Sequence, residues 1–172
     1  MERAKASQKW EKLRLEKGTS FDDSDPSCPI HVIRSIEGFA DIDSGTIGCG
    51  SLVYAVKPGD GSAREQAASC QKVLGGWANI AREYATKRYR SNLINWGMLP
   101  FLIDGEPPFE KYDNIFIPYI RRAVAEKRAS ITAYALTKDG VRPFELTLGD
   151  LTDDERAIIL AGCLINYYRA QK

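Results

Sequence analysis

The strongest constraint on the fold is an alternation of strand-like and helix-like segments in the first half of the chain. Each strand-like segment is short, apolar and partly β-branched or aromatic, and each helix-like segment ends at glycine. In the order strand, helix, strand, helix, these segments are residues 51–57, 63–74, 77–81 and 83–96. This order predicts a βαβ unit whose two strands run parallel.

The second half of the chain predicts short strands and one closing helix. Residues 114–119, 130–137 and 141–148 have strand patterns, and Asp139-Gly140 between the last two is typical of a tight hairpin. Thr152 and Glu155 form a capping box ahead of the apolar run 157–168, so we expect one helix there.

Upstream, residues 4–17 are charged and compatible with a helix, and a loop rich in aspartate and proline follows over residues 21–29. Glycines separate short apolar pieces over residues 30–50, which predicts an irregular segment with one strand at most. We therefore expect residues 1–29 to be an N-terminal extension or linker and residues 30–172 to form one α/β domain.

Composition narrows the class of protein. The chain of 172 residues is 44% apolar and 27% charged, its N-terminus is polar, and no apolar run approaches the ~18 residues of a membrane span, so we expect a cytoplasmic protein. A net charge of +1 favours neither nucleic acid nor membrane as a partner. Basic clusters occur, and we interpret them as solvated helix faces: residues 87–90, 121–122 and 127–128.

The residues that most often bind metals or act as bases are sparse. Four cysteines are far apart in the sequence and form no C-x-x-C pair, so we interpret them as buried, reduced thiols: Cys28, Cys49, Cys70 and Cys163. The single histidine, His31, lies beside a proline-rich loop and is assigned no catalytic role.

The segment whose residues could bind a ligand or take part in catalysis is the glycine-rich loop of residues 58–67. It lies between the first strand and the first helix. Backbone amides at a helix start have no intrahelical partner, so together with the helix dipole they can bind an anion. Arg64 adds a planar fork that suits a carboxylate. The alternative is structural, because Ser62 and Glu65 match a capping box and Arg64 would then be a solvated side chain.

At these residues the sequence resembles a known family. Gly59-Asp60-Gly61-Ser62-Ala63-Arg64-Glu65 is similar to the Gly-x-Gly-Ser-Ser-Arg-Glu loop of aconitases, homoaconitases and isopropylmalate dehydratases. Further segments resemble the same family in the same order: residues 74–76, 91–93, 97–101, 144–148 and 161–166. The resemblance implies a three-layer β/β/α swivelling domain, as in the C-terminal domain of aconitase and the small subunit of isopropylmalate dehydratase.

The resemblance also implies roles for individual residues. The family serine that removes a proton from the substrate, as an alkoxide, falls on Ser62, and the arginine that binds a substrate carboxylate falls on Arg64. Gly61 and Ala63 complete the expected substrate-binding loop. A second carboxylate-binding arginine would be expected upstream, and Arg34 is the candidate, although an ordinary surface arginine is the more frequent occurrence.

Two departures from the family pattern concern the substrate. Ala63 stands where many members have a second serine, and Gln66 stands where many have histidine. The family's upstream Asp-x-x-Ser/Thr-x-Asp-His-Ile type of segment is not found. The resemblance therefore leaves the choice of acid open.

Family members hold a 4Fe-4S cluster through three cysteines on a larger domain, and this chain has no such trio. The resemblance thus implies a cluster-bearing large subunit or domain as partner, a di- or tricarboxylate such as citrate or isocitrate as substrate, and no activity for the isolated chain. We expect the swivel domain of an aconitase-type hydro-lyase. The alternative is a binding or interaction module that has kept the fold without catalysis.

Overall fold

The computed structural model describes residues 21–171, which form two compact units. One unit contains residues 21–49, 107–117 and 133–144, and the other contains residues 50–106, 118–132 and 145–171. The helix predicted over residues 4–17 lies outside the described part. The predicted boundary between residues 29 and 30 stays a prediction.

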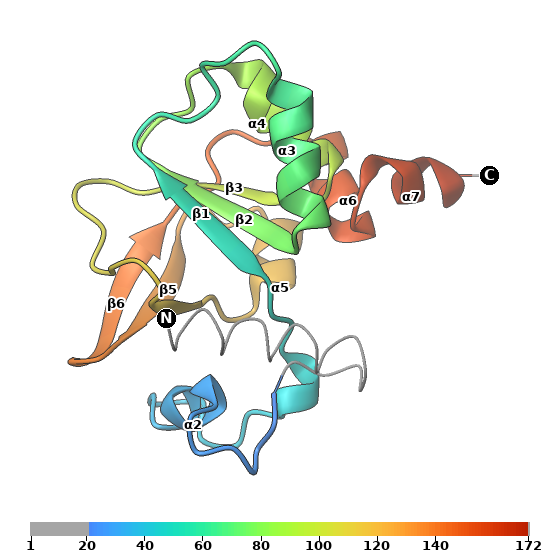
Figure 1. Cartoon of the computed structure of the whole chain (residues 1–172). Helices are drawn as coiled ribbons and strands as arrows, with labels where there is room; N and C mark the ends of the chain where they lie inside the picture. Colours follow the sequence, from blue (N-terminus) through green and yellow to red (C-terminus); the bar gives the residue numbers. More distant parts are fainter. Residues whose placement is uncertain (1–20, 172) are drawn as a thin grey trace. The chain divides into compact units, whose positions relative to one another are not determined.

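A parallel sheet forms the centre of the second unit (Figure 1). Its strands follow the order β1-β2-β3: β1 (Ser51–Ala55), β2 (Gly76–Ala81) and β3 (Leu99–Leu102). Both neighbouring pairs are parallel, with Val53 opposite Asn79 and Asn79 opposite Pro100. The predicted βαβ unit and the α/β class are confirmed. The third strand was not predicted, because a proline lacks the N–H that a strand interior normally uses.

Helices α3 (Arg64–Val73) and α4 (Lys87–Asn95) connect these strands and lie on the same side of the sheet (Figure 1). Their contact is apolar, with Ala68 of α3 packed in one cluster with Leu93 of α4 and with Met98. Helix α4 begins later than predicted because Thr86 caps it, its Oγ1 accepting a hydrogen bond from Tyr89 N. This arrangement places the start of α3 beside the start of α4.

The remaining helices of this unit are α5 (Ile120–Ala125), α6 (Asp153–Ala161) and α7 (Leu164–Arg169). The capping box of Thr152 and Glu155 is confirmed at the start of α6. The single closing helix is wrong, because Gly162 adopts a φ of +90° and separates α6 from α7. Its carbonyl lies so close to Gly97 that a Cβ on Gly97 would be 1.8 Å from it.

The first unit contains α2 (Pro29–Arg34), the 3-10 turn η1 (Ser44–Thr46) and most of a second sheet, in the order β4 (Asn114–Phe116), β5 (Ile131–Thr137) and β6 (Gly140–Leu146). Strand β4 pairs antiparallel with β5. Its core gathers Ile33, Phe39, Phe116 and Leu136.

The irregular segment predicted over residues 30–50 contains helix α2 and η1, and the one strand that was allowed for it is not found. Pro29 occupies the first turn, where its fixed φ favours a helix. Ile30 and Ile33 are three residues apart and both are buried, which is the spacing of a helix face.

The longest described helix is α3, with ten residues, so none of the helices in residues 21–171 could reach across the hydrocarbon core of a membrane.

Candidate anion site at the start of helix α3

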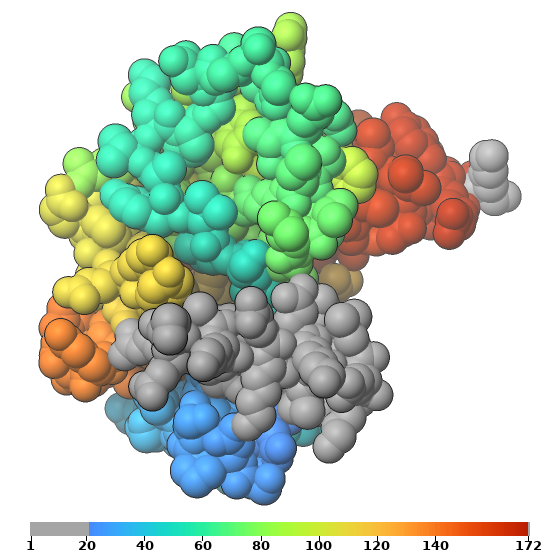
Figure 2. Space-filling view, in the orientation of Figure 1, coloured from blue at the N-terminus to red at the C-terminus, as the bar shows by residue number. Residues whose placement is uncertain are grey.

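The loop between β1 and α3 is held against α4 by one glycine. Gly59 has a φ of +96°, and a Cβ at this position would come within 2.6 Å of the Tyr89 side chain. The Gly59 carbonyl accepts hydrogen bonds from Arg64 Nε at 3.0 Å and from Thr86 Oγ1 at 3.3 Å. Figure 2 shows the teal segment that contains this loop at the surface of the unit, where a solute can reach it.

The start of α3 has no side-chain cap. Ala63 is the N-cap residue and cannot accept a hydrogen bond through its methyl group. The alternative in which Ser62 and Glu65 form a capping box is therefore wrong. Ser62 is exposed, and within residues 21–171 its hydroxyl makes no hydrogen bond to protein. The first-turn amides of α3 therefore remain available for an external acceptor.

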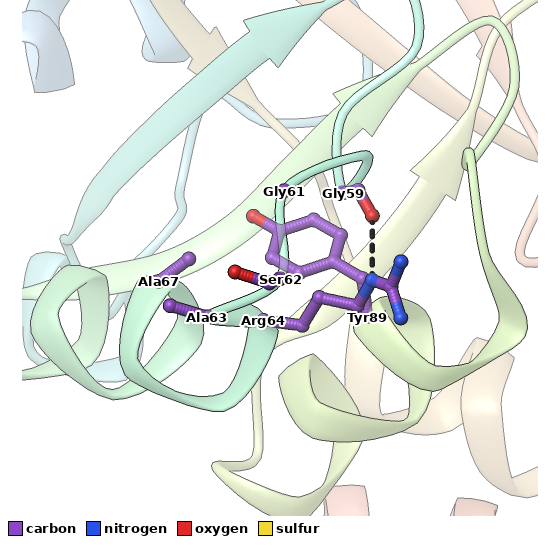
Figure 3. Close-up of a pocket in the computed structure, with 7 residues that line it drawn as sticks. All are labelled: Gly59, Gly61, Ser62, Ala63, Arg64, Ala67 and Tyr89. Atoms are coloured by element: carbon purple, nitrogen blue, oxygen red, sulfur yellow. Dashed lines mark hydrogen bonds between the residues drawn. The ribbon is translucent and has the colours of Figure 1, made fainter.

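A hollow of about 320 Å³ opens at this helix start (Figure 3). We call it the α3 hollow, and its lining residues are Gly59, Gly61, Ser62, Ala63, Arg64, Ala67 and Tyr89. It brings together four of the five predicted site residues: Gly61, Ser62, Ala63 and Arg64.

The fifth predicted site residue, Arg34, is not among the lining residues. It pairs with Asp23 at 3.0 Å and donates to the Ile42 carbonyl within the first unit. These contacts give Arg34 a structural role in that unit, and its assignment to a substrate carboxylate stays a prediction.

The Ser62 hydroxyl and the Arg64 guanidinium point toward opposite sides in Figure 3. Arg64 is half-buried and turned back onto the Gly59 carbonyl, which occupies its Nε. Both terminal nitrogens keep their donors, so the guanidinium can still bind a carboxylate end-on while Nε stays on Gly59. A ligand that contacts both side chains would have to span the hollow or draw Arg64 toward Ser62.

Hydrogen bonding, rather than net charge, must select a ligand here. Asp60 and Glu65 are both exposed beside the loop and would repel an anion at long range. Amides at the helix start and the Arg64 fork act at contact distance, where their direction matters more than the net charge nearby. The site therefore suits a small anion that accepts several hydrogen bonds.

Tyr89 was not predicted as a site residue, because residues 87–90 were interpreted as a solvated basic face. Lys87 and Arg88 are exposed as predicted, but Tyr89 is only 5% exposed and lines the α3 hollow. Arg90 is half-buried and donates to the carbonyls of Leu148 and Asp150. The spacing of Tyr89 and Leu93, four residues apart on one helix face, was the available signal.

The basic clusters at residues 121–122 and 127–128 are solvated, as predicted, but most of their charges are paired. Arg122 and Arg128 both contact Glu126, and Lys127 contacts Asp153. Arg121 donates to the Leu160 carbonyl at 3.0 Å. Paired cations offer less attraction to a phosphate backbone than free ones.

The cysteines do not meet the requirements of a metal cluster. Cys28 is buried as predicted, whereas Cys70 is exposed and Cys49 and Cys163 are half-buried, so the prediction of four buried thiols is wrong. Across residues 21–171, no three side chains of histidine, cysteine, aspartate or glutamate lie close enough to hold a metal ion together. A 4Fe-4S cluster therefore does not fit the described part of this chain.

A glycine turn links a parallel strand to an uncapped helix in this α/β domain, and the start of that helix is a candidate site for a small anion. Residues 49–106 match the family model of the aconitase C-terminal domain, and this segment contains the whole α3 hollow. The resemblance to aconitases is thereby confirmed for this part of the chain, including residues 74–76, 91–93 and 97–101. The resemblance of residues 144–148 and 161–166 lies outside the match and stays a prediction.

Among solved structures, the chain is similar to a 3-isopropylmalate dehydratase from Methanocaldococcus jannaschii. The two are 22% identical, with a TM-score of 0.47, and the alignment covers 77% of this chain and 73% of the other. No curated protein is significantly similar to the chain.

Gly59 and Gly61 should respond differently to alanine. We expect Gly59→Ala to lower the free energy of unfolding by about 2 kcal/mol or more, because the positive φ and the Tyr89 contact both oppose a Cβ. Gly61→Ala should leave stability unchanged or raise it by up to ~1 kcal/mol, because its Cβ would meet nothing within 4 Å. Urea denaturation of both variants measures this, and equal losses would contradict it.

Proposed function

We propose that this chain is the swivel domain or small subunit of an aconitase-type hydro-lyase, which removes and re-adds water on a di- or tricarboxylic acid. One observation carries the proposal. Ser62 and Arg64 both line the hollow at the uncapped start of α3, within the segment that matches the aconitase C-terminal domain.

In this proposal Ser62 is the base. Its alkoxide takes the proton from the carbon next to a substrate carboxylate, and the proton goes to Oγ. A serine hydroxyl is a weak acid, so the anion needs donors and positive potential close by. The first-turn amides of α3 and the helix dipole are placed to supply both.

Arg64 would bind a carboxylate of the same substrate. Its guanidinium can form two parallel hydrogen bonds to a carboxylate through its terminal nitrogens. Gly61 would allow the substrate to approach the backbone, since a Cβ there would project into open space. Ala63 places a methyl group where many relatives have a hydroxyl, which would change the set of acids that bind.

The 4Fe-4S cluster would belong to a partner subunit or to a separate domain, because the described cysteines do not fit it. We therefore expect the isolated chain to give no measurable hydration of cis-aconitate, and activity to emerge when a cluster-bearing large subunit from the same genome is added. The assay follows the loss of the substrate double bond by ultraviolet absorbance. Turnover by the isolated chain would contradict the division of labour proposed here.

A second candidate is a binding module without catalysis, and one observation favours it. The Arg64 guanidinium is turned onto Gly59 and away from the Ser62 hydroxyl. A module would bind carboxylates through Arg64 and the helix start and would not need Ser62 as a base. Loss of ligand binding in an Arg64 variant, combined with unchanged function in a Ser62 variant, would favour the module.

A further inference from the structure

A buried chain of hydrogen bonds lies behind the α3 hollow and joins three elements. Gln71 of α3 donates through Nε2 to the Ala78 carbonyl at 3.3 Å and to Asn79 Oδ1. Asn79 of β2, which is fully buried, donates through Nδ2 to the Tyr89 hydroxyl oxygen of α4 at 3.0 Å. Asn79 is the only buried polar residue among those described, so this series of hydrogen bonds is unusual in the core of the unit.

Which group donates in each of these hydrogen bonds follows from the Ala78 carbonyl. A backbone carbonyl can only accept, so the Gln71 group that faces Ala78 must be the NH₂. The same NH₂ faces Asn79, so Asn79 must present its oxygen there and its own NH₂ to Tyr89. The Tyr89 oxygen therefore accepts, and its proton must point elsewhere.

The α3 hollow is the open space that borders Tyr89. Tyr89 is 5% exposed, lines the α3 hollow, and within residues 21–171 its hydroxyl has no acceptor for its proton. In the view of Figure 3 its hydroxyl and the Ser62 hydroxyl lie on the same side, away from the Arg64 guanidinium. The neighbouring Tyr84 differs, because its hydroxyl donates to the Phe101 carbonyl at 3.2 Å, and burial raises its pKa well above the usual range.

We propose that Tyr89 is a further ligand-binding residue, whose hydroxyl donates a hydrogen bond to a carboxylate oxygen of the acid bound beside Ser62. This rests on the proposed function, since it names a contact in the same hollow. The Tyr89 oxygen accepts a hydrogen bond from Asn79, and this bond polarises the phenol and makes its O–H a better donor. The bond from the buried Asn79 amide holds the hydroxyl oxygen in place. Tyr89 therefore favours a ligand that brings an oxygen acceptor to this end of the hollow.

The test uses the full chain and citrate as the probe, at constant ionic strength. Tyrosines carry ¹³C at Cζ, the Tyr89 signal is identified by its loss in Tyr89→Phe, and backbone amides of Gly61 and Ser62 are followed in parallel. We expect the Tyr89 signal to shift with the same Kd as these amides, and the Tyr84 signal to stay in place. Movement of the amides without Tyr89 would overturn this inference and leave the anion site standing. If neither the Tyr89 signal nor the amide signals shift, citrate does not bind at the start of α3, and both the anion site and this inference are wrong.

Two variants separate ligand contact from structural support. Tyr89→Phe keeps the ring against Gly59 and removes only the hydroxyl, so citrate should bind about tenfold more weakly, in line with one hydrogen bond to a charged group. Gln71→Leu disturbs the same buried chain but leaves the Tyr89 hydroxyl in place. It should lower the melting temperature and change the Kd for citrate by less than roughly threefold. Equal weakening in both variants would show a structural role and overturn the assignment.

Discussion

Ser62→Ala is expected to lower kcat of the assembled enzyme about 10³-fold, which is the range for removal of a catalytic base. KM should change by less than roughly threefold, since the hydroxyl would act in the transition state more than in substrate binding. Ser62 is exposed and caps no helix, so the variant should fold normally. Steady-state kinetics with the cluster-bearing partner present measures the effect.

Ser69→Ala is the matched control for this prediction. Ser69 lies on helix α3, which begins just after Ser62, donates only to the Gln66 carbonyl, at 3.2 Å, and does not line the hollow. The kcat of the Ser69→Ala enzyme should stay within about twofold of the parent value, as expected for a substitution remote from the reacting atoms. If Ser62→Ala retained full activity, Ser62 would not be the base and the non-catalytic module would gain support.

Arg64→Lys is expected to lower kcat/KM about a hundredfold. Lysine keeps the charge but cannot form two parallel hydrogen bonds to one carboxylate, and it cannot reproduce the bond from Nε to the Gly59 carbonyl while also reaching a ligand. Loss of charge-assisted hydrogen bonds of about 1.5–3 kcal/mol accounts for this range. A rise in KM should form a large part of the effect, because the carboxylate is bound in both ground and transition states.

Arg88→Ala provides the comparison, because Arg88 is an exposed arginine near the start of α4 and does not line the hollow. Its kinetics should match those of the parent at moderate ionic strength. If both arginine variants lost activity equally, the effect would come from the general electrostatic field of this surface and not from a carboxylate bound by Arg64.

The parallel part of the fold was predictable because strand and helix patterns alternate there without ambiguity. Residues 51–55 and 76–81 are short apolar strands bounded by glycine, and these signals act locally. The loop at Ser62 was predictable for the same reason, since it lies between two strongly patterned elements. Local sequence therefore determines where the α3 hollow begins.

What local patterns cannot predict is the orientation of the groups in the hollow. The turn of Arg64 onto Gly59 depends on a backbone carbonyl whose direction is set by a positive φ and by Thr86, 27 residues further along the chain. Tyr89 was hidden because three of the residues at positions 87–90 are basic, which masked an inward-facing position. These features come from contacts between elements.

The break between α6 and α7 has a similar origin. The apolar run that predicted one helix continues through Gly162, and glycine alone is tolerated within helices. The close approach of its carbonyl to Gly97 favours the break, and that contact joins positions 65 residues apart. No pattern within the closing segment carries this information.

The two hydrogen bonds at the Gly59 carbonyl have a consequence for how the arginine can move. A carbonyl oxygen has two lone pairs, and here Arg64 and Thr86 use one each. If Arg64 swings out, Thr86 still anchors the turn, so a ligand can recruit the guanidinium without loosening the main chain beneath it. Gly59, Arg64 and Thr86 thus allow the Arg64 side chain to move while the main chain at Gly59 stays fixed.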